Sequence, residues 1–398
     1  MTQSKKNKSN ILIAIESFFD GGAEMFAIRL ANELALSQNV FFIELYPERT
    51  REKRQLSLLD KKRITILQPR MGSKTNGWAG KITNKLAKRR AGITPENSLR
   101  DEEVITFIKR NMITVVNSHS WDSDVYFAGL KKEIKFQLVS SFHGHYGLLT
   151  DKRINYDAIT KTTLDSVDKV IYTSPEHQKT LDNYGFPASE RHKIFYGVSM
   201  PLSRNVTKYK AAECLNIVMA ARGIKEKGWE EAILAVLHLL KKYPGLLTLN
   251  LVGEGPYIDY LKTKYNDPAI QFLGYKNNVV EIVKAVHIGI LPTYFVAESL
   301  PNTIIEYLFC GKPVITTNVG AIKEMMSPGS ELAGTCIDLQ NSKVDVDLIS
   351  AAIENYLNNP ALVEKHSLLA LKAAEKFTMK TCIENYLNVF RLPSSDKN

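Results

Sequence analysis

Short β-branched or aromatic runs alternate with longer helical patterns along the whole chain, and this alternation is the feature that most constrains its fold. Such alternation is typical of a parallel sheet covered by helices. Strands are predicted in the first half at 11–15, 40–45, 64–67, 113–117, 136–142 and 169–173. In the second half they are predicted at 215–221, 247–252, 270–273, 287–291 and 313–317. Each set is enough for one doubly wound α/β domain.

A chain of 398 residues is too long for one ordinary hydrophobic core and suits two domains of about 150–200 residues. Segment 197–213, between the two sets of strands, is polar, contains a proline and has no apolar period, as expected of a linker. We therefore predict two Rossmann-like domains, at 1–200 and 201–379, that face a central cleft. Region 71–97 is predicted to be a long loop, and the last eight residues are predicted to be frayed.

The cysteines and the apolar segments limit the compartment. The four cysteines form no close pair and show no metal-ligand spacing, which favours a reduced protein over a disulfide framework. No segment resembles the core of a secretory signal, and none approaches the roughly 18–20 apolar residues of a membrane span. We therefore predict a cytoplasmic protein, either soluble or peripheral on the inner face of a membrane.

The net charge of +10 is concentrated in basic runs of the first half, at 49–54, 61–63, 85–90 and 131–135. Two interpretations stay open for these runs. They are typical of solvated loops and helix faces, and they are equally typical of a surface that meets anionic lipid headgroups or an anionic acceptor. The runs lack interleaved aromatic residues and accompany no nucleic-acid-binding motif, so nucleic acid is not a predicted partner.

The segment that follows the predicted strand 287–291 carries the most informative pattern. A loop leads into a helix that is predicted to begin around Asn302 and to end near Gly311, which fits a helix C-cap. Glu298 lies in that loop, and Glu306 lies about one turn inside the helix. Both carboxylates are therefore expected to face the region around the helix N-terminus.

This helix N-terminus offers a site for a nucleotide. Free backbone N–H groups and the positive end of the helix dipole bind phosphate oxygens. Glu306 can accept two hydrogen bonds from the cis-diol of a ribose, and Glu298 can hold hydroxyls of a sugar. Two glutamates eight residues apart also occur commonly with one capping a helix and one solvated, so the pair alone is weak. The donor-binding residues predicted between them are Ser299, Leu300, Pro301, Asn302 and Thr303.

Three more segments follow predicted strands of the second half. Arg222 and Lys227 are cations of the kind that stabilise a leaving diphosphate, although lysines near a helix start are often only solvated. Gly253 opens a Gly-Glu-Gly-Pro turn, where a missing side chain permits close approach of a base or ribose. The turn Phe272-Leu273-Gly274 ends the predicted strand 270–273. Each of these turns is otherwise an ordinary connection.

Glycines and histidines follow strands of the first half. Gly21 and Gly22 join strand 11–15 to a helix, where backbone N–H groups can approach phosphate. The pair does not form the G-x-G-x-x-G fingerprint, which argues against a dehydrogenase. His119 and His143 each follow a strand. A single histidine in such a position is usually structural, whereas two at the carboxyl ends of one sheet favour a site.

Residues Glu298–Glu306, followed by Gly311-Lys312-Pro313, resemble the E-x7-E signature of retaining glycosyltransferase family 4. The stretch 221–228 resembles the family's G-R-x(3–4)-K-G segment, and the other motifs follow in the family's order over essentially the whole chain. The resemblance implies the GT-B fold, which has two Rossmann-like domains. It also implies a C-terminal helix, at about 380–398, that crosses back to the first domain. Its apolar residues at helical spacing are Ile383, Leu387 and Phe390.

The resemblance also implies roles for single residues. It assigns Arg222 and Lys227 to the donor diphosphate and places His119 beside the transferred sugar. The predicted catalytic residues are therefore His119, Glu298, Arg222 and Lys227. The predicted donor site adds Gly22, Gly253, Leu273, residues 299–303 and Glu306, and the predicted acceptor site contains Gly21, His119 and His143.

Three segments depart from the family pattern, apart from the small change of the family's glycine to Ala221. Asn117 stands where the family has the first histidine of an H-x-H segment, and Tyr196 stands where it has asparagine. Residues 307–309, Tyr-Leu-Phe, replace the alanine and methionine that the family more often has after its second glutamate. The first two departures concern the predicted acceptor side, and the third concerns helix packing.

The predicted activity is transfer of a sugar, with retention of anomeric configuration, from a UDP- or GDP-sugar to a glycan or lipid-linked acceptor. Bacterial surface polysaccharide synthesis is the expected setting. No metal or other cofactor is predicted, because no Asp-x-Asp pair ends a strand and the resemblance implies metal-independent catalysis. Two alternatives stay open, which are a sugar-nucleotide 2-epimerase of the same architecture and a two-lobed binding protein without catalysis.

Overall fold

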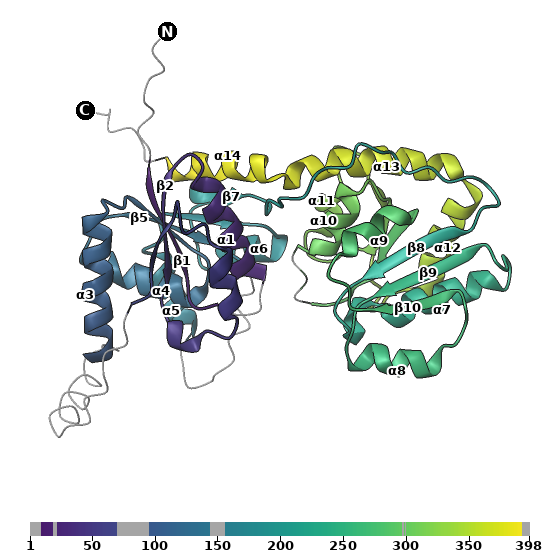
Figure 1. Cartoon of the computed structure of the whole chain (residues 1–398), viewed down its shortest axis with the longest axis horizontal. Coiled ribbons are helices and arrows are strands. Elements are labelled where there is room, and N and C mark those ends of the chain that lie inside the picture. The colour runs from purple at the N-terminus through teal and green to yellow at the C-terminus, as the bar shows by residue number, and fades with distance from the viewer. Residues whose placement is uncertain are drawn as a thin grey trace, which may run out of the picture. The chain divides into compact units, whose positions relative to one another are not determined.

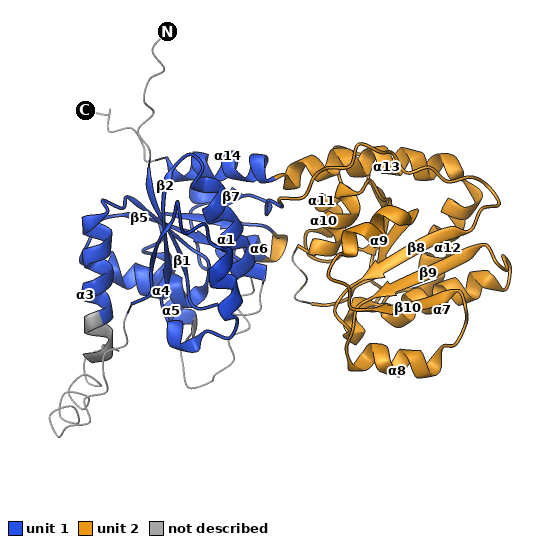
Figure 2. Cartoon of the chain, viewed as in Figure 1, with its two compact units in different colours: residues 1–173, 177–198, 379–398 blue, residues 174–176, 199–378 orange. Residues whose placement is uncertain are grey.

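The computed structural model describes residues 9–18, 22–69, 95–143, 156–296, 298 and 300–391. The chain divides into two compact units (Figure 2). Unit 1 comprises residues 1–173, 177–198 and 379–398, and unit 2 comprises residues 174–176 and 199–378. Of the predicted loop 71–97, residues up to 94 lie outside the described part, as do the final residues 392–398. Residues 95–97 are helical, which corrects the end of that loop.

Unit 1 contains a sheet of seven parallel strands in the order β3-β2-β1-β4-β5-β6-β7. Six of them are the strands predicted from the first half of the sequence. The seventh, β7, was not predicted, because its three residues are Arg-His-Lys and carry no apolar pattern. The strands are β1 (Asn10–Ile15), β2 (Asn39–Glu44), β3 (Thr65–Leu67), β4 (Val115–Ser118), β5 (Gln137–Ser141), β6 (Lys169–Tyr172) and β7 (Arg191–Lys193).

Helices cover both faces of this sheet (Figure 1). Alternate residues of β1 point to opposite faces, and Ile11–Ile15 are all buried, so this part of the strand is a continuous apolar run rather than an alternating one. One face packs against α1 and α14, and the other packs against α3, α4, α5 and α6. These helices are α1 (Gly22–Leu34), α3 (Pro95–Arg110), α4 (Trp121–Leu130), α5 (Tyr156–Leu164), α6 (Pro175–Asn183) and α14 (Met379–Phe390). Short 3-10 turns lie at Pro47–Arg49, Lys53–Leu58 and Ala188–Glu190.

Helix α14 is the predicted C-terminal helix that returns to the first domain. Of the apolar residues expected on this helix, Phe390 is buried, and Ile383 and Leu387 are partly buried against the same core. Cys382 and Tyr386, which were not singled out, are fully buried. The Lys169 ammonium at the start of β6 donates to the carbonyl oxygen of Val389 (2.7 Å) and fixes the end of the helix to the sheet.

Unit 2 contains a sheet of six parallel strands in the order β10-β9-β8-β11-β12-β13. Five were predicted, and β13 was not, because Gly-Thr-Cys-Ile is too short and weakly apolar to stand out. The strands are β8 (Leu215–Ala220), β9 (Leu247–Val252), β10 (Ile270–Gly274), β11 (Ile288–Leu291), β12 (Val314–Thr317) and β13 (Gly334–Ile337). The helices are α7 (Trp229–Leu240), α8 (Pro256–Lys264), α9 (Val279–Ala285), α10 (Asn302–Phe309), α11 (Ile322–Met325), α12 (Val346–Asn358) and α13 (Pro360–Ala374). Short 3-10 turns lie at Lys225–Lys227 and Glu375–Phe377.

Both sheets follow the same plan. In each, the first three strands run outward from the centre and the fourth strand starts on the other side of the first, which is the Rossmann order 3-2-1-4-5-6. The prediction of two Rossmann-like units is therefore confirmed. The order reverses between β1 and β4 in unit 1 and between β8 and β11 in unit 2. Ligands of such folds bind beyond the carboxyl ends of the two strands between which the order reverses. We call this place the reversal point of each unit.

Candidate active site at the carboxyl ends of the strands

The reversal point of unit 2 brings together two of the predicted segments. The loop after β8 carries Arg222 and Lys227, and the loop after β11 carries Glu298. The two loops are joined because the backbone N–H of Tyr294 donates to the carbonyl oxygen of Glu226 (2.8 Å). Gly228 permits this approach, since a Cβ there would lie 2.1 Å from the carbonyl oxygen of Pro292 and its φ is +83°. Strand order and one glycine thus place the predicted cations beside the predicted carboxylate.

Lys227 and Glu298 form a buried ion pair. The Lys227 ammonium donates to the Glu298 carboxylate, and only 9% of each side chain is exposed. The hydroxyl of Thr293 donates to the same carboxylate (3.2 Å). The Lys227 nitrogen also lies 5.0 Å from the centroid of the Phe295 ring. Sequence reasoning nominated both residues separately but missed the pairing, which fixes the position of the Glu298 side chain at the reversal point.

Arg222 is exposed, as is Lys225 on the same loop, whereas Lys227 is buried. Its guanidinium carbon lies 5.6 Å from the centroid of the Phe295 ring, an attractive cation–π distance. Its carbonyl oxygen accepts a hydrogen bond from the indole nitrogen of the fully buried Trp229 (2.9 Å). The backbone of Arg222 is therefore fixed by the core of unit 2 while its charge faces solvent.

Helix α10 begins at Asn302, as predicted, and its N-cap is Pro301. Proline has no side-chain oxygen with which to cap the helix, so the first N–H groups of α10 receive no side-chain bond from it. Leu300 and Pro301 are buried and Asn302 is exposed, whereas the Thr303 hydroxyl already donates to the carbonyl oxygen of Ala220 (2.9 Å). Glu306 lies one turn further along and is partly exposed, and Ser299 is outside the described residues.

Tyr307, the departure inside α10, anchors the helix to the sheet. Its hydroxyl accepts a hydrogen bond from the backbone N–H of Ala220 (3.0 Å) and donates to the carbonyl oxygen of Val218 (3.2 Å). The ring fits because Gly289 faces it, where a Cβ would lie 2.3 Å from the ring. Burial raises the pKa of this hydroxyl well above its usual range, so the hydroxyl stays protonated.

The glycine turns of unit 2 hold loops against one another. A Cβ on Gly253 would lie 2.2 Å from the carbonyl oxygen of Ala221, and one on Gly223 would lie 2.3 Å from the carbonyl oxygen of Glu254. The glycine at 253 is therefore required by the neighbouring loop, whatever ligand it contacts. Leu273 lies at a bulge, because the β9–β10 register passes from Phe272 directly to Gly274. Its backbone is thus left out of the strand ladder, where a base edge can reach it.

The reversal point of unit 1 contains Gly22, the first residue of α1, and His119, which follows β4. Gly22 is exposed, and a Cβ there would meet nothing within 4 Å. Gly21 lies outside the described residues. His119 is buried, and its backbone N–H donates to the carbonyl oxygen of Ala14 on β1 (2.9 Å). The predicted histidine therefore sits at the reversal point, below the surface.

Both ring nitrogens of His119 are already bonded within unit 1. Nδ1 lies 2.8 Å from Nε2 of His143, and Nε2 lies 2.8 Å from the side-chain oxygen of Asn117. Burial lowers the pKa of His119 to about 3, and burial, with smaller effects of the nearby His119 and His177, lowers the pKa of His143 well below its usual value. Both imidazoles are therefore neutral at physiological pH. A direct bond from His119 to a sugar would require one of its present partners to leave.

The two departures on this side, Asn117 and Tyr196, belong to the same cluster. The Tyr196 ring stacks on His143 with centroids 4.9 Å apart, and its hydroxyl donates to the carbonyl oxygen of Phe142 (3.2 Å). Phe26 of α1 packs against both rings, with centroids 4.6 Å from Tyr196 and 5.7 Å from His143. The contacts join residues far apart in sequence, so no local pattern could have revealed them.

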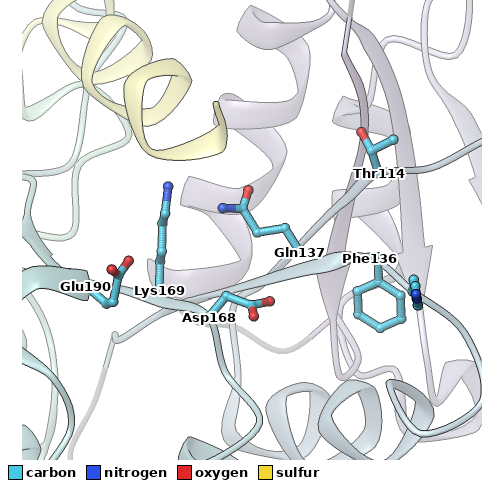
Figure 3. A pocket seen from close by; sticks show the side chains of 7 residues that line it. Thr114, Phe136, Gln137, Asp168, Lys169 and Glu190 are labelled. Atoms are coloured by element: carbon cyan, nitrogen blue, oxygen red, sulfur yellow. The ribbon is translucent and has the colours of Figure 1, made fainter. Parts of the chain in front are cut away.

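Unit 1 has a pocket at the amino ends of its strands, on the side of the sheet away from His119 and Gly22, and it contains none of the predicted site residues (Figure 3). Its volume is about 540 Å³. It lies at the amino ends of β4, β5 and β6, away from the edge where parallel sheets bind their ligands. Its lining residues are Thr114, Lys135, Phe136, Gln137, Asp168, Lys169 and Glu190.

Within the described ranges, no group of three or more His, Cys, Asp and Glu side chains could hold a metal ion. Over the same ranges, no helix has the length and apolar character needed to cross a bilayer.

Two family models match the chain, one for each half. The model described as Glycosyltransferase Family 4 matches residues 20–200. The model described as Glycosyl transferases group 1 matches residues 215–359. The two matches leave only the segment 201–214 between them, which contains no helix or strand.

Curated proteins and solved structures match over long stretches. A 41.2 kDa protein from the cps region of Klebsiella pneumoniae is 21% identical over 320 residues, which are 72% of this chain and 81% of that relative. The O-antigen chain mannosyltransferase B of Escherichia coli is 28% identical over 125 residues, 31% of this chain and 30% of the relative.

The solved structures establish the fold. A glycosyltransferase of Rickettsia africae is 18% identical, with a TM-score of 0.71 over 96% of this chain and 98% of that one. The HepE protein of Anabaena, solved with UDP, is 16% identical, with a TM-score of 0.67 over 95% of this chain and 98% of that one. The two family models and the two Rossmann-like sheets together identify the chain as a glycosyltransferase of the GT-B fold.

Proposed function

We propose that this glycosyltransferase moves a sugar from a UDP- or GDP-sugar to a glycan or lipid-linked acceptor, with retention of anomeric configuration and without a metal. The observation that carries the proposal is the buried Lys227–Glu298 pair, which lies at the reversal point of unit 2 with Arg222 on the same loop. This arrangement supplies a fixed carboxylate for sugar hydroxyls and an exposed cation for phosphate.

The donor would bind along the carboxyl edge of the unit 2 sheet. Its diphosphate would meet the N-terminus of α10, whose proline cap leaves backbone N–H groups for an anion. The ribose would meet Glu306, and the base would meet the bulge at Leu273. The Anabaena HepE protein has been solved with UDP and with UDP-glucose, which supports a nucleotide-sugar donor for a chain of the same fold.

Charge development explains why no metal is needed in this proposal. As the glycosidic bond breaks, the leaving diphosphate gains negative charge, which Arg222 and the α10 N–H groups would stabilise. Because Lys227 is paired with Glu298, its main task is to keep that carboxylate charged and oriented. The acceptor hydroxyl would attack from the face that the diphosphate leaves, and a departing phosphate oxygen would take its proton. No protein nucleophile is required.

The setting in surface polysaccharide synthesis is supported by the O-antigen chain mannosyltransferase and by the cps-region protein. The basic runs of unit 1 support a membrane surface less strongly than their sequence suggested. Arg49 pairs with Glu16 (2.8 Å), Lys131 pairs with Asp168 (2.6 Å), and Arg63 pairs with Asp60. Part of the excess charge is therefore neutralised within the unit. Co-sedimentation with anionic vesicles at low salt tests membrane binding directly.

The first test of the donor site is a thermal-shift panel of nucleoside diphosphates and their sugars. A ligand at about 100-fold excess over its Kd adds about 2.7 kcal/mol of stability. Glu306→Ala should abolish the shift for the matching nucleotide. Glu281→Ala, which removes an exposed glutamate on α9, should leave it intact. A panel without any nucleotide-dependent shift would contradict the donor site.

The second test separates transfer from the alternative activities. Incubation with the sugar nucleotide alone should leave the donor sugar unchanged, and epimerised product would identify a 2-epimerase instead. With donor and acceptor present, proton NMR of the product should show the anomeric configuration of the donor. Activity should persist in EDTA. Nucleotide binding without any turnover would indicate a binding protein.

A further inference from the structure

The amide of Asn117 has a fixed orientation at the end of β4. The side chain is fully buried, and its nitrogen donates to the carbonyl oxygen of Val139 (2.9 Å) and to the hydroxyl oxygen of Ser141 (3.0 Å). A carbonyl oxygen can only accept, so the nitrogen of the amide must face β5. The amide oxygen of Asn117 must then face Nε2 of His119, 2.8 Å away.

This orientation fixes the proton positions of two histidines in turn. An amide oxygen can only accept, so Nε2 of His119 carries its proton and donates to Asn117. Because His119 is neutral, its Nδ1 is unprotonated and accepts from Nε2–H of His143 (2.8 Å). His143 is also neutral, so its remaining nitrogen, Nδ1, carries a lone pair and no proton.

Nδ1 of His143 is buried and has no hydrogen-bond partner among the residues that the structure describes. The ring cannot turn freely to find one. Tyr196 stacks on one side of it, with an interplanar angle of 24°, and the bond to His119 fixes its other nitrogen. A buried acceptor left without a donor is unfavourable, so it marks a place where a ligand can supply one.

We propose that Asn117 is a positioning residue, which fixes the tautomers of His119 and His143 so that Nδ1 of His143 accepts the hydrogen bond of the acceptor hydroxyl. The proposal rests on the proposed glycosyl transfer and refines the predicted role of His119. That residue connects Asn117 to His143 and does not itself contact the sugar. The ligand chemistry follows from the proton positions, because a bare imidazole nitrogen selects a donor such as a hydroxyl and not an anion.

The two departures from the family pattern have complementary tasks in this arrangement. Asn117 supplies an acceptor whose direction cannot reverse, whereas a histidine in that position could present either a donor or an acceptor. Tyr196 supplies the flat surface that holds the His143 ring. Helix α14 also contacts this cluster. Its Tyr386 hydroxyl lies 3.2 Å from the Ser141 hydroxyl, which accepts a hydrogen bond from Asn117.

Nitrogen-15 NMR of histidine side chains tests the proton positions without any substrate. In the full chain, His119 and His143 should both be protonated at Nε2 and bare at Nδ1, with His119→Gln and His143→Gln used for assignment. Asn117→Asp retains the acceptor and should keep this tautomer of His119. Asn117→Leu removes the acceptor and should produce a mixture of tautomers. A proton on Nδ1 of either histidine in the wild-type chain would overturn the proposal.

Kinetics then tests the acceptor atom. The side-chain amide of His143→Gln reaches the Nε2 position and can still donate to His119, but it supplies no acceptor at Nδ1. Its KM for the acceptor should rise at least 10-fold, while the Kd of the nucleotide changes less than 2-fold. His143→Asn places an amide oxygen near the Nδ1 position and should lose less. His192→Gln, on the edge strand β7, serves as the matched control and should behave as the wild type.

The outcomes separate this proposal from the proposed function. An unchanged acceptor KM in His143→Gln, or an equal loss of nucleotide affinity, would overturn the assignment of Nδ1. A chain that binds no nucleotide and transfers no sugar would overturn the proposed function. The NMR result would then still support or refute the tautomer-fixing role of Asn117, because it requires neither donor nor acceptor.

Discussion

The Lys227–Glu298 pair makes a strong prediction about stability. Lys227→Met keeps the apolar stem of the side chain but removes the ammonium from the Glu298 side chain, of which only 9% is exposed, while the Thr293 hydroxyl still donates to it. Removing one partner of a buried ion pair costs about 3–5 kcal/mol. For a unit of this size that corresponds to a fall in Tm of roughly 6–20 °C. This loss is large beside a typical domain stability of about 5–15 kcal/mol.

The assay must report on unit 2 alone, because two units need not unfold together. Trp229 provides the probe, since it is fully buried and bonded to the loop that carries Lys227. The chain has two other tryptophans, Trp78 and Trp121, which can be replaced by phenylalanine. Urea unfolding followed by the fluorescence of Trp229 then measures the free energy of unfolding of unit 2.

A double-mutant cycle isolates the pair from other effects of each change. Lys227→Met and Glu298→Leu together should lose much less than the sum of the single variants, because no charge is left buried alone. Lys225→Met, which removes an exposed lysine two residues away, should change stability by less than about 0.5 kcal/mol. A loss below about 1 kcal/mol for Lys227→Met, or additive losses in the cycle, would refute the buried pair.

Three further predictions concern single features. Gly228→Ala should destabilise unit 2 by about 1–3 kcal/mol in the same urea assay, because φ is +83° and the new Cβ would lie 2.1 Å from a carbonyl oxygen. Burial lowers the pKa of His119 to about 3. Between pH 6.5 and 3, His119 is therefore protonated in the unfolded chain and neutral in the folded chain. Stability of unit 1 should therefore be complete above pH 6.5 and fall as the pH drops toward 3, by at most about 1.4 kcal/mol per pH unit for this group. Between pH 7.5 and 5.5, the free energy of unfolding of unit 1 should change less in His119→Asn than in the wild type. Tyr386→Phe should cost about 0.5–1.5 kcal/mol, as it loses the contact with Ser141 but retains the buried ring, and a loss above 3 kcal/mol would contradict that estimate.

The strands could be predicted well from the sequence because of where they lie. Central strands of a doubly wound sheet are covered on both faces, so they are continuous apolar runs such as Ile11–Ile15. The edge strands β3 and β10 still carry apolar residues and were predicted. The edge strands β7, with Arg191 and Lys193, and β13, with its glycine and threonine, were not predicted, because their short sequences lack an apolar run. A strand is thus recognisable in the sequence only where its residues are apolar, and burial on both faces requires this of central strands alone.

The candidate site could be predicted only as a set of residues and not as a set of contacts. Arg222, Lys227 and Glu298 are recognisable because each follows a strand, but residues 227 and 298 lie 71 positions apart, and their pairing depends on the strand order. The same limit applied to glycine. Gly253 was expected to make room for a ligand, whereas its missing Cβ makes room for the carbonyl oxygen of Ala221.

The departures from the family pattern gain meaning when their neighbours are considered. Tyr307 is bulkier than the residues that the family more often has there, and it fits because Gly289 on β11 has no side chain to oppose it. Asn117 and Tyr196 likewise share one partner, since both act on the His119–His143 pair.

Such compensation is physically required, because a packed core resists a change in volume or in hydrogen bonding at one site alone. A return to the family residue at one of these positions alone should therefore weaken the chain. Alanine at Tyr307 would leave a cavity beside Gly289 and remove the bonds of the hydroxyl to Ala220 and Val218. Histidine at Asn117 would free the tautomers that the asparagine fixes. The departures are best understood as local solutions that preserve the fold and reposition its polar groups.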